Sequence, residues 1–395
     1  MTIAAAIESR TAEASVRLRA SRVADVDIVC DLSAAKAIWI DLQTEEPFFT
    51  PYQRFDFLSI WQREVGARDN VQPFIVIAYD VERRPLMLLP LGLKLKHGVR
   101  TASFMGGKHT TFNMALWNRE FARTATAADI DALLSKLCAH GAADVLALTQ
   151  QPGRWHGLPN PLAMLQHQES VNLCPVTAIA PDASAATPIS NSLRKRLRSK
   201  ERKFQSLPGY RYHVATSDSD IARLLDWFFQ IKPLRMAEQK LPNVFAEDGV
   251  EDFIRRACMA KTAGGRVIDI HALECDEEVI ALYAGVADGD RFSMMFNTYT
   301  MSENARYSPG LILMRYIVDH CANLGYRALD LGIGSDEYKR MFCKSDEPIF
   351  DSFIPLSVRG RMAATTMSAI NRGKYLVKQN RALFHLAQRL RGAFH

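Results

Sequence analysis

Polar and titratable side chains gather in residues 328–342, directly after a predicted strand. The strand Ala328–Leu331 ends in two spaced glycines, Gly332 and Gly334, which let another backbone or a ligand approach closely. A tyrosine can donate a proton to a departing thiolate, and a lysine can hold an anion. The candidates for such chemistry are Asp330, Glu337, Tyr338 and Lys339. The alternative interpretation, a turn followed by a short solvated helix, applies most strongly to Glu337.

A helix start lies shortly before this segment. Ser308 is a suitable N-cap and Pro309 a suitable first helical residue, and Gly325 can end the helix. The free backbone N–H groups and the positive end of the helix dipole favour an anion such as a diphosphate. An ordinary well-capped helix without a ligand is the alternative.

Two further features bear on chemistry. His109 follows a glycine pair and could reach a cleft between two halves of the chain, although an exposed loop histidine without a role is the alternative. The cysteines number 7 and are never spaced as C-x-x-C. This pattern predicts neither a disulfide framework nor a metal site, and it favours a reducing cytoplasm.

The combined pattern resembles the cellulose-biosynthesis-type (CelD-like) branch of the GNAT acetyltransferase family, which is related to the FemAB peptidyl transferases. The shared elements are an S-P-G helix start, a D-x-G-x-G strand end and a Y-K-x-x-F stretch. Here they are Ser308-Pro309-Gly310, Asp330-Gly332-Gly334 and Tyr338-Lys339-Phe342. The resemblance spans about 190–358, whereas the first half matches only in element order and in the turn at 104–107. One departure is that SENARYSPG stands where many GNAT enzymes carry a Q/R-x-x-G-x-G/A loop.

The resemblance implies an acyl donor, acetyl-CoA, lying between strands 292–300 and 328–331. Its carbonyl would accept a backbone N–H from near Phe296, and Tyr338 would protonate the leaving thiolate. Asp330 would be a possible base, and one of Asn297 and Tyr299 would contact substrate while the other lies in the core. The implied donor-binding residues are Phe296, Arg306, Ser308, Gly310, Gly332 and Gly334. The implied catalytic and substrate-binding residues are Tyr338, Lys339, Asp330, Asn297, Tyr299, Glu337 and His109, with no metal expected.

Strand-like and helix-like periodicities alternate along the chain and predict an α/β fold. The order of elements in 15–180 recurs in 190–358, which indicates two tandem GNAT-like halves. A flexible segment, 1–14, precedes them, a linker rich in Pro, Ser, Thr and Ala spans 181–191, and a basic amphipathic tail covers 359–395.

Positive charge is concentrated in two segments, although the formal net charge is only +6. The helical segment 190–204 has 7 Lys and Arg and one Glu, and 359–395 has 8 and no acidic residue. The cations at 194–203 could bind a phosphate or nucleotide, or could be the solvated back of a docked helix. The tail is predicted to contact an anionic membrane surface, with packing against the body as the alternative. This distribution does not favour DNA binding, and no apolar run is long enough to cross a membrane.

The sequence therefore predicts a cytoplasmic enzyme, peripheral on the inner membrane face. Its predicted reaction is acetyl-CoA-dependent N- or O-acetylation of an activated or lipid-linked sugar in exopolysaccharide or envelope synthesis. Two alternatives remain open. One is FemAB-like aminoacyl transfer to a peptidoglycan precursor, and the other is a catalytically inert double-GNAT binding protein.

Overall fold

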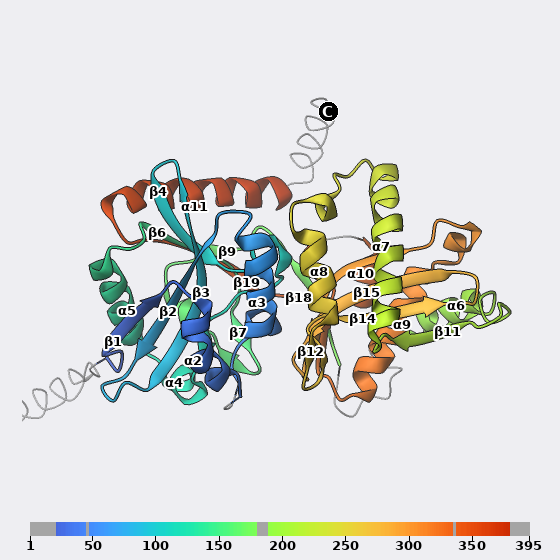
Figure 1. Ribbon diagram of the computed structural model, residues 1–395, viewed down its shortest axis with the longest axis horizontal. Helices are drawn as coiled ribbons and strands as arrows, with labels where there is room; N and C mark the ends of the chain where they lie inside the picture. The colour runs from blue at the N-terminus through green and yellow to red at the C-terminus, as the bar shows by residue number, and fades with distance from the viewer. Residues whose placement is uncertain (1–20, 45–46, 180–188, 335–336, 380–395) are drawn as a thin grey trace, which may run out of the picture.

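The computed structural model describes residues 21–44, 47–179, 189–334 and 337–379. The predicted flexible segment 1–14, most of the linker 181–191 and the tail beyond residue 379 lie outside the described residues. Two mixed sheets lie side by side, each covered by helices (Figure 1). This confirms the predicted α/β fold with two tandem GNAT-like halves.

The first sheet has one pair of parallel strands among antiparallel neighbours. Its order is β1-β2-β3-β4-β6-β19-β9, with β5 pairing β3, and only β4 and β6 run parallel among its described strands. Apolar runs such as PFIVIAY in β2 are buried on both faces, which is typical of a central strand. The strands are β1 (Asp25–Val29), β2 (Gln72–Tyr79), β3 (Pro85–Lys96), β4 (Val99–Phe104), β5 (Leu116–Trp117), β6 (Val145–Pro152), β9 (Gln168–Glu169) and β19 (Ile349–Pro355).

The second sheet repeats this arrangement. Its order is β11-β14-β15-β16-β17-β10-β18, and β16 and β17 are the parallel pair. The strands are β10 (Cys174–Ala178), β11 (Arg211–Val214), β14 (Asp269–Glu274), β15 (Val279–Ala287), β16 (Arg291–Tyr299), β17 (Ala328–Asp330) and β18 (Ser345–Glu347). Two small ribbons are β7 (Arg154–Trp155) with β8 (Leu158–Pro159), and β12 (Lys261–Thr262) with β13 (Gly265–Arg266).

The two halves exchange a strand. β10 follows the first half in sequence but pairs with β17 and β18 of the second sheet. β19 follows the second half but pairs with β6 of the first. Sheet membership therefore crosses the predicted boundary between the halves at 181–191. Local periodicity specifies that a strand exists, but not which sheet it joins.

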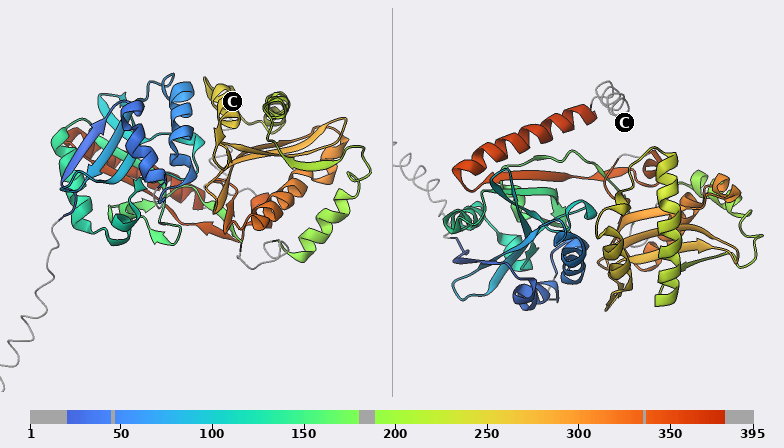
Figure 2. Two further views of the ribbon diagram at one scale, coloured as in Figure 1. Left: turned by 60° about the horizontal axis from the view of Figure 1, so that its bottom comes forward. Right: turned by 45° about the horizontal axis from the view of Figure 1, so that its top comes forward.

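Helices connect the strands of each half and cover the sheets (Figure 2). The caps follow local sequence, since Thr126 and Asp129 form a capping box at α5 and Ser217 caps α7. The α-helices are α2 (Leu32–Thr44), α3 (Phe55–Trp61), α4 (Arg119–Thr124), α5 (Ala127–His140), α6 (Asn191–Glu201), α7 (Asp218–Glu238), α8 (Val250–Met259), α9 (Pro309–Asn323), α10 (Glu337–Phe342) and α11 (Val358–Gln379). The shorter helical turns are η1 (Pro51–Gln53), η2 (Gln62–Gly66), η3 (Gly107–His109), η4 (Pro161–Met164), η5 (Val244–Ala246) and η6 (Glu303–Tyr307).

The halves pack directly on one another through α3 and α8. The Phe57 and Phe253 rings meet edge to face at 5.3 Å between centroids. Gly249, with φ +77°, is the N-cap residue of α8, and a Cβ there would lie 1.9 Å from the carbonyl oxygen of Glu64. This close approach requires glycine. Arg68 adds ion pairs to Asp248 and Asp252.

The first part of the basic tail is the helix α11, which lies across the first sheet (Figure 1). A Cβ at Gly360 would lie 1.7 Å from the carbonyl oxygen of Asp144, so the helix sits very close to the sheet. Asn371 donates to Asp351, and Ser368 donates to Gln168. Residues 358–378 thus pack on the body of the protein. Contact of the outer face of α11 with a membrane stays a prediction. Among the described residues, no helix is long and apolar enough to cross a membrane.

Candidate functional site

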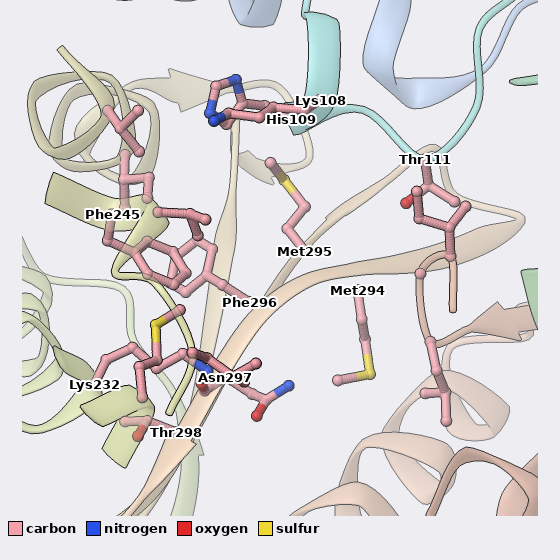
Figure 3. A pocket seen from close by; sticks show the side chains of 18 of the residues that line it. Lys108, His109, Thr111, Lys232, Phe245, Met294, Met295, Phe296, Asn297 and Thr298 are labelled. Atoms are coloured by element: carbon pink, nitrogen blue, oxygen red, sulfur yellow. Dashed lines mark hydrogen bonds between the residues drawn. The ribbon is translucent and has the colours of Figure 1, made fainter. Parts of the chain in front are cut away.

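A cavity of about 740 Å³ lies between the two halves (Figure 3). Its walls come from the η3 loop of the first half, from α7 and α8, from β16, from the loop after β17 and from α10. The cavity therefore needs both halves, although most of its residues belong to the second.

The strands β16 and β17 separate at the wall of this cavity. Their parallel pairing ends at Ser293 and Asp330, and β16 continues to Tyr299. The pairing of β16 with β15 skips Met295, which forms a β-bulge next to the separation. Gly332 follows with φ +69°, and a Cβ there would lie 3.0 Å from the carbonyl oxygen of Met294. The opening thus presents strand backbone to a ligand on one side.

Lys339 and Tyr338 reach the cavity from α10. Lys339 is buried, and its Nζ donates to the carbonyl oxygens of Gly332 (3.2 Å) and Ile333 (2.9 Å). The lysine therefore fixes the loop that forms one side of the opening. Tyr338 is half-buried and lines the cavity. Burial raises the pKa of Tyr283 behind it, and the neighbouring Tyr338 and Tyr299 add to that effect.

Asp330 lies beneath the cavity and does not line it. Its carboxylate is fully buried, and it accepts hydrogen bonds from Arg291 Nε (2.8 Å), Ser293 Oγ (2.9 Å) and the backbone N–H of Gly332 (3.0 Å). These three donors engage both carboxylate oxygens and hold the side chain in one orientation. The location favours a role in positioning over the general-base role considered from sequence.

A chain of hydroxyl groups connects Asp330 to the cavity wall. Tyr52 Oη lies 2.8 Å from Ser293 Oγ and 3.0 Å from Thr111 Oγ1, and Thr111 lines the cavity. Burial raises the pKa of Tyr52 well above its usual range, so the phenol stays protonated. Ser293 Oγ donates to Asp330, and Tyr52 Oη donates to Thr111 Oγ1, an oxygen that has a second lone pair. Thr111 Oγ1 is then left as a hydrogen-bond acceptor at the wall.

The start of α9 lies behind Tyr299. A Cβ on Gly310 would lie 3.6 Å from the Tyr299 ring, and Tyr299 lines the cavity. Pro309 is the first helical residue, as predicted. The predicted side-chain cap by Ser308 is wrong, because this residue adopts φ +59° and its Oγ accepts a hydrogen bond from Lys200 Nζ (2.7 Å). Arg306 is exposed on η6 and faces Glu303 at 3.6 Å.

The remaining predicted residues divide between the cavity and the surface. Phe296, Asn297 and Tyr299 line the cavity, whereas Glu337 is exposed and outside it. Asn297 and Tyr299 both line the wall because residues two apart share a face of a strand, and Tyr299 also packs against the core of the second half. The lining residues among the sequence candidates are Phe296, Asn297, Tyr299, Gly332, Tyr338, Lys339 and His109, and those outside it are Asp330, Arg306, Ser308, Gly310, Gly334 and Glu337.

His109 reaches the cavity from the first half, where Figure 3 shows it beside Lys108. The Trp61 Nε1–H donates to its Nδ1 (3.1 Å), which leaves the proton of the neutral ring on Nε2. Burial, with a smaller contribution from Lys108, lowers the pKa of His109. The imidazole is therefore neutral at neutral pH.

Sequence analysis missed the cations of α7. The Lys232 Nζ donates to the carbonyl oxygen of Asn297 (2.9 Å), and the Arg235 guanidinium stacks on the Tyr299 ring at 3.5 Å. Lys232 and Arg235 are three positions apart, so they share one helix face. That spacing was visible in the sequence, but nothing local showed that this face borders a cavity.

One cluster elsewhere has the residue types of a metal site. Ligand atoms of His213, Asp220 and Glu274 all lie within 4.8 Å of one another. Both carboxylates are engaged by Arg223, at 2.5 Å for Asp220 and 2.8 Å for Glu274. A cation would have to displace this arginine, so the donor set fits an ion-pair network better than a metal site.

Comparison with known proteins supports this description. Residues 191–340 match the family model described as an acetyltransferase (GNAT) domain. No curated protein matches the chain by sequence.

Solved structures share the fold across both halves. A conserved protein of unknown function from Bacteroides thetaiotaomicron is 9% identical, with a TM-score of 0.54 over 84% of this chain and 100% of that chain. FemX is 10% identical, with a TM-score of 0.53 over 83% and 96%. The C-terminal domain of a putative lysylphosphatidylglycerol synthetase from Agrobacterium fabrum is 11% identical, with a TM-score of 0.51 over 87% and 97%. At such identities the likeness shows the fold alone. The chain thus has a tandem GNAT-like fold, and its residues 191–340 match a GNAT acetyltransferase domain.

Proposed function

We propose that the chain is an acyltransferase of the cellulose-biosynthesis-type branch, moving an acetyl group from acetyl-CoA to nitrogen or oxygen of a sugar. The acceptor would be an activated or lipid-linked sugar precursor in exopolysaccharide or envelope synthesis. The observation that carries the proposal is the opening between β16 and β17, with its bulge at Met295, inside a domain that matches acetyltransferases. This opening adjoins a cavity large enough for an acceptor.

The proposed reaction assigns a role to each side of the opening. The acceptor nucleophile attacks the thioester carbonyl carbon, the C–S bond breaks, and Tyr338 protonates the thiolate. The proton that the attacking N–H or O–H loses passes through solvent and restores the Tyr338 phenol. A backbone N–H near Phe296 stabilises the developing oxyanion. Thr111 Oγ1 accepts a hydrogen bond from the attacking N–H or O–H and so orients it. Lys339 and Asp330 act through the loop and the hydroxyl chain, which makes them positioning residues in this mechanism.

The test of this proposal is thiol release from acetyl-CoA in the presence of a panel of amino sugars and sugar nucleotides. Tyr338→Phe should lower kcat by about 100-fold or more, since a proton donor is lost. Tyr326→Phe is the matched control, because Tyr326 lines a separate cavity of about 410 Å³ and should leave kcat unchanged. Absence of acetyl-CoA binding by calorimetry would reject the proposal.

Aminoacyl transfer is the second candidate. The fold likeness to FemX and to the lysylphosphatidylglycerol synthetase domain favours it, as does the departure of 302–310 from the usual diphosphate loop. Mass spectrometry of products made with acetyl-CoA or with aminoacyl-tRNA separates the two reactions. If neither donor binds, a catalytically inert binding protein is the remaining interpretation.

The proposal also includes a place at an anionic membrane surface. The outer face of α11 exposes cations beside large apolar side chains, namely Arg359, Arg361 and Lys374 beside Val358, Met362 and Ile370. Such a face suits peripheral contact with the inner membrane leaflet. The exposed cations on α6 and directly after it could bind a phosphate or nucleotide, namely Lys195, Arg196, Arg198, Arg202 and Lys203. Arg194 is buried against Asp319. Equal partition of the intact and tail-truncated protein onto anionic vesicles would reject the membrane contact.

A further inference from the structure

Among the described residues, the charged side chains that line the cavity all carry positive charge. None of the described residues that line it is an aspartate or glutamate, whereas four are cationic: Lys108, Lys232, Arg235 and Lys339. Lys108 is neutralised by Glu247, and Lys339 is held by backbone carbonyls. Arg235 has no carboxylate partner among the described residues. Lys232 and Arg235 are the two cations that α7 presents to the cavity, where low-dielectric walls strengthen their potential.

Both of these cations are held in place by β16. Arg235 stacks on Tyr299, and its Nη1 donates to the carbonyl oxygen of Thr300 (3.4 Å). Lys232 donates to the carbonyl oxygen of Asn297 and lies 5.7 Å from the centre of the Phe245 ring. A stacked guanidinium keeps its N–H edge in one plane, which suits an oxyanion. These contacts reduce the entropy that binding an anion would cost.

The rest of the cavity is apolar. Side chains of α8 and of the segment before it form one wall, and methionines of α7 and β16 complete it. These residues are Phe245, Val250, Phe253, Ile254, Met236 and Met294. Leu241 and Val244 also line the cavity, but they remain 52% and 39% exposed, which places them at its opening. An apolar rim open to water is typical of a surface that a ligand covers.

We propose that the cavity binds an amphiphilic anion, a molecule that joins a phosphate or carboxylate to an apolar chain. The anionic group lies between Lys232 and Arg235, and the chain follows the α8 wall and leaves past Leu241 and Val244. The ligand is the acyl acceptor of the proposed reaction. That last assignment rests on the proposed function, whereas the binding itself does not.

Calorimetry with synthetic amphiphiles below their micellar concentrations tests the chemistry directly. Decyl phosphate should bind at least about tenfold more tightly than decanol, because the head group meets two cations. It should also bind at least about tenfold more tightly than butyl phosphate or inorganic phosphate, because the chain is buried. Decanoate in place of decyl phosphate separates a carboxylate ligand from a phosphate ligand. Equal affinity for decanol, or tighter binding of decyltrimethylammonium, would overturn the proposal.

Variants of the full chain locate the site. Lys232→Met and Arg235→Met keep much of the apolar stem, and each should weaken decyl phosphate binding about tenfold or more. Lys136→Met in α5 is the matched control and should change nothing, because Lys136 does not line the cavity. Leu241→Asn, at an exposed position, should weaken decyl phosphate while leaving inorganic phosphate unaffected. Unchanged affinity in both cation variants would show that the anion binds elsewhere.

Competition with acetyl-CoA separates this inference from the proposed function. Decyl phosphate should bind with unchanged or higher affinity when acetyl-CoA is saturating, since the acceptor and donor sites are distinct. Displacement by acetyl-CoA would overturn the assignment of the ligand as acceptor. If acetyl-CoA fails to bind while decyl phosphate still binds through Lys232 and Arg235, the acyl transfer fails and the amphiphile site stands.

Discussion

The two halves share a strand order, but they differ in how far one strand of the parallel pair continues beyond the pairing. In the second half β16 continues to Tyr299 after its pairing with β17 has ended at Ser293. In the first half β4 ends at Phe104, one residue after its last pairing with β6 at Ser103. The chain then turns at Gly106, where a Cβ would lie 2.4 Å from the Thr110 side chain. One half thus keeps an opening, and the other closes it and supplies Lys108–Thr111 to the wall of its neighbour's cavity.

The same difference is visible in an ion pair that each half carries at the corresponding place. An arginine of β4 or β16 meets a carboxylate on or next to the strand parallel to it: Arg100 with Asp144, and Arg291 with Asp330. Arg100 remains 41% exposed, but Arg291 is only 6% exposed and lies near the rings of Phe112 and Trp155 from the first half. The pair in the second half therefore joins the halves at the base of the cavity. The comparison predicts that it is the more important of the two for stability.

Replacement of each arginine by methionine gives the largest expected difference. Arg291→Met leaves the buried Asp330 without its guanidinium and should cost about 3–5 kcal/mol of the free energy of unfolding. Arg100→Met removes a half-exposed partner and should cost less, about 1–2 kcal/mol, since the backbone N–H of residue 100 and Ser357 still donate to Asp144. Urea unfolding followed by tryptophan fluorescence measures both values. Equal costs in the two variants would contradict the proposed asymmetry.

Glycines after the parallel strands offer a second, smaller test. Gly332 and Gly107 have φ of +69° and +52°, so alanine at either position should cost about 1–2 kcal/mol from backbone strain. At Gly332 the new Cβ also meets the Met294 carbonyl oxygen at 3.0 Å, whereas at Gly107 it meets only Trp61 at 3.6 Å. Gly332→Ala should therefore be the less stable variant by unfolding and should also weaken acetyl-CoA binding. If Gly107→Ala alone weakened acetyl-CoA binding, the assignment of the opening to the second half would be wrong.

The sequence predicted the parts of this asymmetry that are local. The glycines after β17 and the Tyr338-Lys339 pair are near neighbours in the chain, and Gly332, Tyr338 and Lys339 line the cavity. The exchange of β10 and β19 was not predictable, because pairing partners far apart in sequence leave no local periodicity. The cations of α7 were missed for a related reason. Their spacing defines a helix face, but only tertiary packing determines what that face borders.

The last expected difference between the halves is a response to acid, which is absent at neutral pH. His271 of β14 is the one fully buried histidine among the described residues, and its Nδ1 lies 2.9 Å from Tyr212 Oη. Burial, with smaller contributions from His320 and His213, lowers its pKa to about 3. The unfolded chain therefore takes up a proton first as the pH falls below the ordinary value of 6.5. Stability present above that value is lost between it and the folded pKa, at about 1.4 kcal/mol per pH unit.

His271→Gln isolates this response, because glutamine keeps a polar partner for Tyr212 but does not titrate. Urea unfolding of both proteins from neutral pH to the acid limit of reversibility gives the two slopes, and carboxylates contribute equally to each. The wild-type slope should exceed that of the variant by one proton, about 1.4 kcal/mol per pH unit. Since the first half holds no fully buried histidine among its described residues, exchange of amide hydrogens in β14 and β15 should rise with acid before that in β2 and β3. Equal slopes for the wild type and for His271→Gln, or earlier amide exchange in the first sheet, would contradict an acid response specific to the second half.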